Sequence, residues 1–137
     1  MKRRLGVAAF LVLATLAGGA ANGSAGSASA TVKVTVKEFS LKPAATIASA
    51  GKVTFAVQNV GRVDHELVVL RTTRAASRLF LASTGDVYEV GRIARTKPID
   101  AGRTARLTLT LKPGHYALIC NLPGHYRAGQ WANFTVR

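Results

Sequence analysis

Cysteine is almost absent from this chain of 137 residues, in which Cys120 is the only one. A single cysteine excludes an internal disulfide. In an exported protein it leaves three roles open: a buried and inert side chain, a bond to another molecule, or a metal ligand. No cysteine stands near the small-residue segment close to the N-terminus, which argues against a lipoprotein anchor.

Long hydrophobic runs are absent too. Residues 5–17 read LGVAAFLVLATLA, which falls short of the roughly 20 residues that a membrane-spanning helix needs. The basic stretch MKRR precedes this run, and small residues follow it up to Ala28-Ser29-Ala30. This order predicts a secretory signal peptide over residues 1–30 and an exported domain over residues 31–137, in the periplasm, the cell envelope or the extracellular space. An uncleaved leader that anchors the protein in the membrane is the less favoured alternative.

Acidic residues are scarce, with 6 Asp and Glu against 19 Lys and Arg. Residues 31–137 hold 16 of the basic residues and all 6 acidic ones, which gives them a net charge of +10. Such a surface attracts anionic partners. Nucleic acid is a poor candidate, because the protein is expected to be exported and its basic residues are not interleaved with aromatic ones. An acidic partner protein and a generally Arg-rich, soluble surface are the two interpretations that remain.

Helical periodicity is confined to residues 72–83, which predict a helical turn or a loop. Elsewhere apolar and polar residues alternate along residues 31–39, 52–61 and 103–114, as they do in half-buried strands, and Gly, Pro or Asn favours a turn at the end of the last two. Residues 65–71, 115–120 and 131–136 are shorter runs that are also predicted to be strands. There is no internal repeat and no second domain. The pattern predicts an all-β Greek-key sandwich of about seven to eight strands with a short helical or loop insertion.

The one cysteine stands at the end of a predicted strand, close to two other potential metal ligands. In ALICNLPGHYRAGQ (residues 117–130), His125 and Gln130 follow Cys120 at equal intervals, with four residues between successive members. A loop of this length can bring the three side chains to one point. His65 lies where a turn leads directly into another strand. We therefore expect its imidazole to approach the same end of the sandwich.

One thiolate, two imidazoles and a weak fourth donor form the trigonal set that suits copper in both of its oxidation states. Zinc is less well served, because structural zinc sites have four strong donors and catalytic ones keep an open water position. His115 falls on the opposite strand face from Cys120, so we expect it to be exposed to solvent. Asn59 and Asn121 are expected either to orient the ligand loops by hydrogen bonds or to serve only as turn residues.

The sequence resembles the cupredoxins, the small blue (type 1) copper proteins. NVGRVDHE (residues 59–66) is similar to the segment with the family's first histidine, and KPGHYALICNLPGHYRAGQ (residues 112–130) to its cysteine, second histidine and axial-ligand segment. The resemblance implies one copper ion with three equatorial ligands and an axial one, which are His65, Cys120, His125 and Gln130. Most family members have Met at the axial position, whereas the stellacyanin-like branch has Gln with this spacing. The alternative is a Gln that leaves copper three-coordinate or bound by a nearby carbonyl.

The resemblance also implies a one-electron carrier that works between redox partner proteins, and we expect it to be a monomer. No pairing of a general acid with a base and no Ser-His-Asp arrangement is visible, which argues against an enzyme. The ring edge of His125 would be the exit point for the electron, within an apolar docking patch of Leu122, Pro123 and Ala128. Two alternatives remain open: copper sequestration or delivery, and a copper-free domain used for protein contacts.

Overall fold

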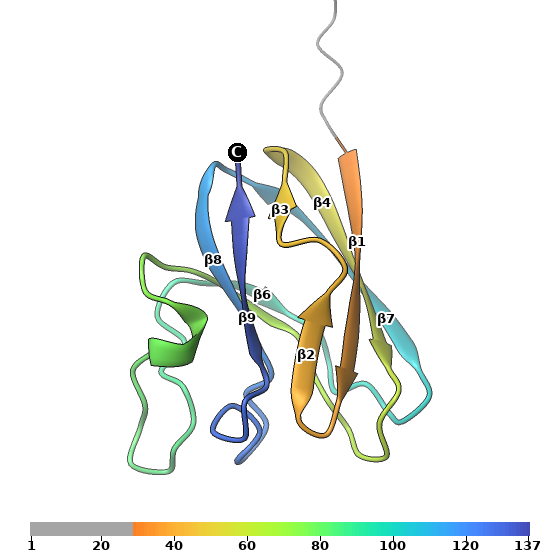
Figure 1. Cartoon of the computed structure of the whole chain (residues 1–137), viewed down its shortest axis with the longest axis vertical. Coiled ribbons are helices and arrows are strands. Elements are labelled where there is room, and N and C mark those ends of the chain that lie inside the picture. Colours follow the sequence, from red (N-terminus) through yellow and green to blue (C-terminus); the bar gives the residue numbers. More distant parts are fainter. Residues whose placement is uncertain (1–28) are drawn as a thin grey trace, which may run out of the picture.

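The computed structural model describes residues 29–137, which fold into two β-sheets packed face to face (Figure 1). One sheet has four strands in the order β2-β1-β4-β7, and the other has five in the order β3-β9-β8-β5-β6. The strands are β1 (Ser29–Lys37), β2 (Ser40–Pro43), β3 (Ile47–Ala48), β4 (Gly51–Asn59), β5 (Val68–Arg71), β6 (Arg92–Arg95), β7 (Thr104–Leu111), β8 (Gly114–Ile119) and β9 (Trp131–Val136). The predicted signal peptide lies outside the described residues, except for Ser29 and Ala30, which belong to β1.

The predicted all-β sandwich is confirmed, with nine strands instead of seven or eight. The three strands that the sequence pattern did not predict are β2, β3 and β6, and each lies at the edge of a sheet. They contain only two to four residues, which is too few for a period of two to be recognised. The predicted insertion is a loop with one 3-10 turn, η1 (Ala76–Arg78).

The main core lies between the two sheets and follows the predicted alternation. Val32, Val34 and Val36 of β1 all point inward and are buried. The rings of Phe55 in β4 and Phe134 in β9 meet edge to face, with 5.3 Å between their centroids, and neither is exposed. Because these two strands belong to different sheets, this aromatic pair joins one layer to the other.

A smaller apolar cluster covers the outer face of the five-stranded sheet. It comprises Val68, Leu70, Ala76, Val87, Ala117, Ile119 and Tyr126, with Leu79 and Trp131 packed against it. The hydroxyl of Tyr126 donates to the carbonyl oxygen of Ala76 at 2.7 Å and accepts from the N–H of Leu79 at 3.1 Å. Strands β5 and β8 are thus buried on both faces, which explains why they read as continuous apolar runs rather than alternating ones.

One end of the sandwich gathers segments that are remote in the sequence. Strands β1 and β4 end there and β9 begins there, at the bottom of Figure 1, opposite the C-terminus. The turn between β1 and β2, the loop after β4 and the loop between β8 and β9 therefore lie close together. This end carries the predicted ligands.

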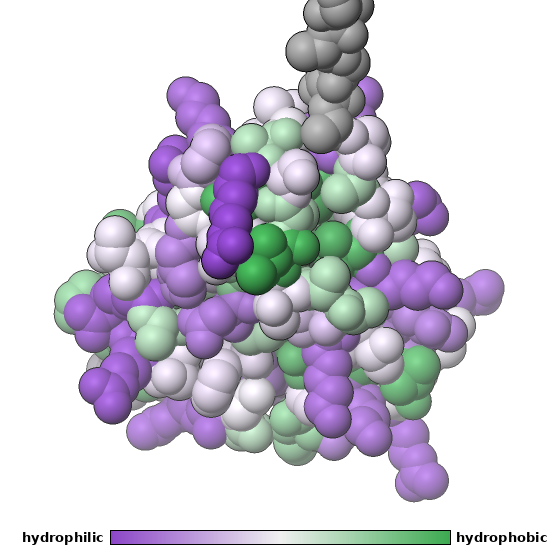
Figure 2. Space-filling model, turned by 45° about the horizontal axis from the view of Figure 1, so that its top comes forward, coloured by the Kyte–Doolittle hydropathy of each residue, from purple (hydrophilic) through white to green (hydrophobic). Residues whose placement is uncertain are grey.

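The other end of the sandwich has a mixed surface. Figure 2 turns this end forward and shows hydrophilic side chains projecting all around it, with separate hydrophobic areas between them. Within residues 29–137, no helix is both long and apolar enough to cross a membrane.

Candidate metal centre

The three strong donors predicted from the sequence converge in the structure. Cys120 Sγ lies 3.4 Å from His125 Nδ1, which in turn lies 3.2 Å from His65 Nδ1. One donor atom from each of the three side chains falls within 4.8 Å of the other two. His65 and Cys120 are fully buried, and His125 is half-buried. The fold thus brings together two nitrogens and one sulfur, although the two histidines are 60 residues apart.

His65 is positioned by the segment between β4 and β5. Its backbone exchanges two hydrogen bonds with Ile99, one at 3.2 Å and one at 2.7 Å. The buried Asn59 donates from Nδ2 to the carbonyl oxygens of Val63 and Ile99, both at 2.8 Å. Its Oδ1 accepts from the N–H of Gly61 at 2.8 Å. Of the two roles expected for Asn59, the orienting one therefore applies, because these bonds fix the path of the chain into His65.

The other donors lie on the loop between β8 and β9. The N–H of Cys120 donates to the carbonyl oxygen of Gln130 at 3.0 Å and closes the loop at its base. Inside the loop, the N–H of His125 donates to Leu122 at 3.0 Å, and the N–H of Gln130 donates to His125 at 3.2 Å. The N–H of Glu66 points at Cys120 Sγ from 3.4 Å. A donor in this position stabilises a thiolate.

Asn121 ties the cysteine segment to the long connection between β5 and β6. Its Oδ1 accepts from the N–H of Val87 at 2.8 Å, and its Nδ2 donates to Glu89 Oε1 at 2.9 Å. Arg95 donates to the same Glu89 oxygen and also to the buried carboxylate of Glu66, the latter at 3.1 Å. The network joins the residue after Cys120 to the residue after His65, so Asn121 does more than form a turn.

Gln130 is fully buried beside the histidines. Its Oε1 and Nε2 lie 3.1 and 3.0 Å from His65 Nδ1. Its Nε2 also faces the carbonyl oxygens of Lys37 at 3.1 Å and Ser40 at 3.3 Å. Because carbonyl oxygens only accept, these two contacts identify Nε2 as the nitrogen end of the amide. Both ends of the amide lie within hydrogen-bonding distance of His65 Nδ1, so the side chain borders the donor cluster.

Glu38 is a residue of the site that no sequence motif indicates. Its Oε1 accepts from His65 Nε2 at 3.1 Å and from the backbone N–H groups of Arg62 and Val63 at 2.8 and 2.9 Å. The backbone bond from Val63, followed by that from Arg62, lowers the pKa of Glu38 to about 2. The charged carboxylate keeps the proton of His65 on Nε2, which leaves Nδ1 free to bind a metal.

Gly61 makes room for this carboxylate. A Cβ atom at position 61 would clash with Glu38 Oε1 and would lie 2.7 Å from Oε2. No local signal in the sequence pairs Glu38 with His65, because the turn after β1 and the loop after β4 meet only in the folded sandwich.

The protonation of the donors also fits a metal. Burial raises the pKa of the Cys120 thiol, so its thiolate needs a positive charge nearby. Burial, followed by the neighbouring His65, lowers the pKa of His125 and favours the neutral imidazole that binds metals. A cation at the centre of the cluster would satisfy both requirements.

His125 is the one strong donor that reaches the surface. The ring of Phe39, which is 46% exposed, meets it edge to face at a centroid distance of 5.1 Å. Of the apolar residues predicted around His125, Pro123 and Ala128 are exposed and Leu122 is half-buried. Phe39 extends this apolar surround from the other sheet.

His115 takes no part in the cluster. It stands at the start of β8, and about 16 Å of strand separates it from Cys120. The expectation that it would simply be exposed to solvent was wrong, since it is half-buried. Its Nδ1 lies 2.8 Å from the carbonyl oxygen of Thr72, and its Nε2 lies 3.1 Å from Asn133 Oδ1. The chain after β5 folds back over this part of the strand.

The donor set fits copper better than zinc. Two imidazole nitrogens, one sulfur and a weak amide oxygen match the trigonal arrangement with a weak axial donor that type 1 copper prefers. A structural zinc site would require a fourth strong donor. Among residues 29–137, the cluster of metal-binding side chains contains only two histidines and one cysteine.

Comparisons with known proteins agree with this geometry. A family model described as a cupredoxin-like domain matches residues 6–130. The structure is similar to that of auracyanin from Roseiflexus castenholzii, with 21% identity, a TM-score of 0.62 and coverage of 82% of this chain and 99% of that one. It is also similar to auracyanin A, a "blue" copper protein from Chloroflexus aurantiacus, with 21% identity, a TM-score of 0.59 and coverage of 80% and 100%.

Rusticyanin from Thiobacillus ferrooxidans shares the fold as well, at 16% identity and a TM-score of 0.58, with coverage of 78% of this chain and 77% of that one. No curated protein matches the chain in sequence. The family model nevertheless spans most of the chain, and the neighbouring structures have the same sandwich. The chain therefore belongs to the cupredoxin-like domain family.

Proposed function

We propose that this protein binds one type 1 copper ion and carries single electrons between redox proteins. His65 and His125 would bind copper through Nδ1 and Cys120 through Sγ, with Gln130 Oε1 as the axial donor. The observation that carries the proposal is the meeting of these donors at one end of the sandwich. Copper in such a site supplies a one-electron redox couple.

The chain's own contribution is to hold the donors still. His65 and Cys120 are buried, and each sits in a segment fixed by backbone hydrogen bonds. The Asn59 and Glu38 side chains brace the His65 segment from two directions. A site that changes little between oxidation states transfers electrons quickly, because little reorganisation accompanies the transfer.

Electrons would enter and leave through the ring of His125. Of the four donor side chains, His65, Cys120 and Gln130 are fully buried, whereas His125 is half-buried. The exposed apolar side chains of Phe39, Pro123 and Ala128 around it would form the docking patch for a partner. Membership of the cupredoxin-like family and similarity to a "blue" copper protein support a carrier rather than an enzyme.

The partner would carry an acidic surface, and the protein would work outside the cytoplasm after removal of its leader. The charge of +10 over residues 31–137 supports the first point, and the basic, apolar and small-residue order of residues 1–30 supports the second. Cleavage after Ala30 would remove two residues from β1. Mass spectrometry of the protein recovered from the cell envelope or the medium tests export, and a mass that includes residues 1–30 would contradict cleavage.

The absorption spectrum of the copper(II)-loaded protein tests the site. We expect an intense blue absorption from Cys120-to-copper charge transfer, and its loss in Cys120→Ser. Circular dichroism of the variant should still show a folded β-sandwich. A colourless wild-type protein after addition of copper(II), or a blue Cys120→Ser variant, would overturn the assignment.

Repeated oxidation and reduction separates a carrier from a protein that sequesters or delivers copper. A carrier keeps its copper through many cycles, which voltammetry followed by metal analysis would show. Release of copper on each reduction would instead indicate copper delivery.

The role of charge is tested by the rate of association with an acidic redox protein, which should fall as salt is raised above about 50 mM.

A further inference from the structure

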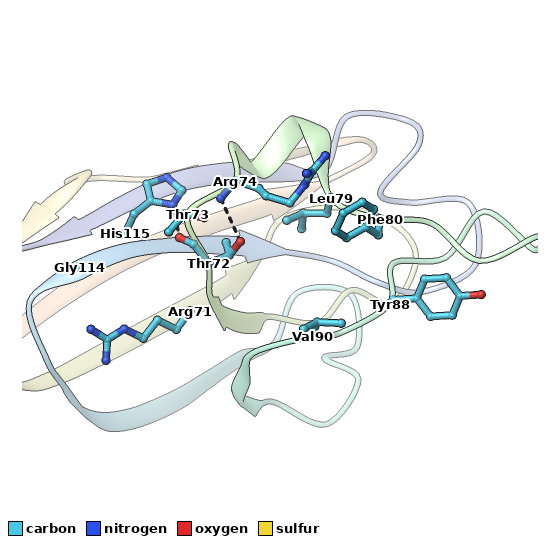
Figure 3. A pocket seen from close by; sticks show the side chains of 10 residues that line it. All are labelled: Arg71, Thr72, Thr73, Arg74, Leu79, Phe80, Tyr88, Val90, Gly114 and His115. Atoms are coloured by element: carbon cyan, nitrogen blue, oxygen red, sulfur yellow. Dashed lines mark hydrogen bonds between the residues drawn. The ribbon is translucent and has the colours of Figure 1, made fainter.

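A pocket of about 470 Å³ opens on the outer face of the five-stranded sheet, away from the metal centre (Figure 3). It lies where the connection between β5 and β6, residues 72–91, meets the start of β8. The connection has 20 residues, with one 3-10 turn and one isolated β-bridge, and connections this long are uncommon in compact domains, where they often carry a function. The pocket has the size of small-molecule sites.

Its walls are apolar and unusually exposed. Phe80 is 60% exposed, Tyr88 57% and Val90 73%, and Leu79 lies beside them. Figure 3 shows Leu79 and Phe80 on one arm of the connection and Tyr88 and Val90 on the other. The N–H of Tyr88 donates to the carbonyl oxygen of Phe80 at 2.9 Å, so the two arms are joined and the pocket is formed in advance.

The charged residues of the lining are both arginines. The guanidinium of Arg74 lies over the Phe80 ring, 4.1 Å from its centroid, and its Nε donates to the carbonyl oxygen of Arg78 at 2.6 Å. The two terminal nitrogens of Arg74 have no carboxylate partner within residues 29–137. Arg71 also lines the pocket, whereas no acidic residue does in the described part of the chain.

We infer that this pocket binds a small amphipathic anion, an aromatic or branched aliphatic body that bears a carboxylate. The carboxylate would pair with the free edge of the Arg74 guanidinium, and the body would lie between Phe80 and Val90. His115 would form only a wall, because both of its ring nitrogens already face oxygen atoms of Thr72 and Asn133. This inference is independent of copper binding, since Cys120 follows the opposite end of β8 from the one that lines the pocket.

Charge argues against a second copy of the chain as the occupant. Two copies that each carry +10 over residues 31–137 repel one another, most strongly at a face that is itself cationic. A ligand with one negative charge gains from the same field.

Titration of the reduced, ¹⁵N-labelled protein with 2-naphthoate, followed by NMR, tests the inference. We expect saturable shifts at the backbone amides of Thr72, Thr73, Arg74, Phe80 and Val90. 2-Naphthalenemethanol, which has the same ring system without the charge, should bind about tenfold more weakly, the ratio expected for one charge-assisted hydrogen bond. Acetate, which has the charge without the ring system, should produce no saturable shift at these amides.

Two variants with matched controls locate the site. Arg74→Gln should weaken 2-naphthoate binding about tenfold, whereas Arg106→Gln, which removes the same charge from the other sheet, should leave it unchanged. Val90→Glu should abolish binding, whereas Ile47→Glu, at the 48% exposed Ile47, should not. Spectra of the free variants are the control for folding.

Three results would overturn the inference. The first is an equal affinity for 2-naphthoate and 2-naphthalenemethanol. The second is equal shifts at Phe39 and Ile47, which would indicate general adhesion to exposed apolar side chains. The third is a shift of the lining amides on dilution without any probe, which would show that a second copy covers the pocket.

Discussion

Glu38 Oε1 lies 3.1 Å from His65 Nε2, so a carboxylate from the end of β1 bonds to the outer nitrogen of a proposed copper ligand. Its negative charge favours copper(II) over copper(I). We expect Glu38→Gln to weaken copper(II) binding by about tenfold. The reduction potential should then rise by about 60 mV for each tenfold change in the ratio of copper(II) to copper(I) affinity.

Voltammetry and competition with a copper chelator measure these two quantities. Asp100→Asn is the matched control, because it removes one negative charge from an exposed side chain outside the donor cluster. If both variants shift the potential equally, the effect is one of net charge and the bond to His65 has no special role.

The same carboxylate predicts a dependence of stability on pH. The pKa of Glu38 is lowered from 4.5 to about 2 by the backbone N–H groups of Val63 and Arg62. A pKa that is lower in the folded state stabilises the fold above about pH 4.5, and this stabilisation is lost as the pH falls towards 2. In metal-free protein, the difference in unfolding free energy between wild type and Glu38→Gln should therefore shrink across this range. Urea unfolding at several pH values measures it, and a constant difference would contradict the role of the charge.

Gly61→Ala should raise the reduction potential as Glu38→Gln does, but by steric displacement of the Glu38 carboxylate instead of by removal of its charge. The added methyl group occupies the place of the Glu38 carboxylate, which must then move away from His65. We expect the potential to rise, and the double variant to show no further rise beyond Glu38→Gln. Gly102→Ala serves as a control, because that residue has a φ of +77° and open space around it. It should cost about 1 kcal/mol of stability without moving the potential.

The axial position predicts an ordered series of potentials. An amide oxygen is a harder donor than a thioether sulfur and favours copper(II), so Gln130→Met should raise the potential. Gln130→Leu, which offers no donor, should raise it further. Copper should stay bound in both, since the histidines and the thiolate remain. Voltammetry of the three proteins in one buffer is the measurement, and coinciding potentials would show that Gln130 does not touch the metal.

The sequence predicts those ligands of the site that lie close together along the chain. Cys120, His125 and Gln130 occupy one loop, so their spacing alone indicates that they can meet. His65 could be added because a turn leads directly into its strand. Glu38 and Phe39 could not, because they approach the histidines from the end of β1, and only the pairing of whole strands brings that turn to the site.

In the fold, too, features set by the local sequence were predicted and features set by contacts between distant segments were not. Strands with clear alternation, such as β1, β4 and β7, were predicted because one of their faces is more buried than the other. The environment of His115 was not, because its burial depends on where the connection after β5 folds back. A period of two identifies the faces of a strand, but it does not reveal which loop will cover the outer one.

The distance in sequence between the donors has a consequence for the lifetime of the protein. A copper ion bound to His65 and Cys120 closes a loop of more than fifty residues in a chain that has no second cysteine for a disulfide. A covalent cross-link over such a span stabilises a fold by about 4 kcal/mol. Bound copper would then act as a cross-link between the two segments. Without copper the protein would unfold more often and would be degraded faster by proteases. A half-life under limited proteolysis that does not change with added copper would show that the sandwich closes without it.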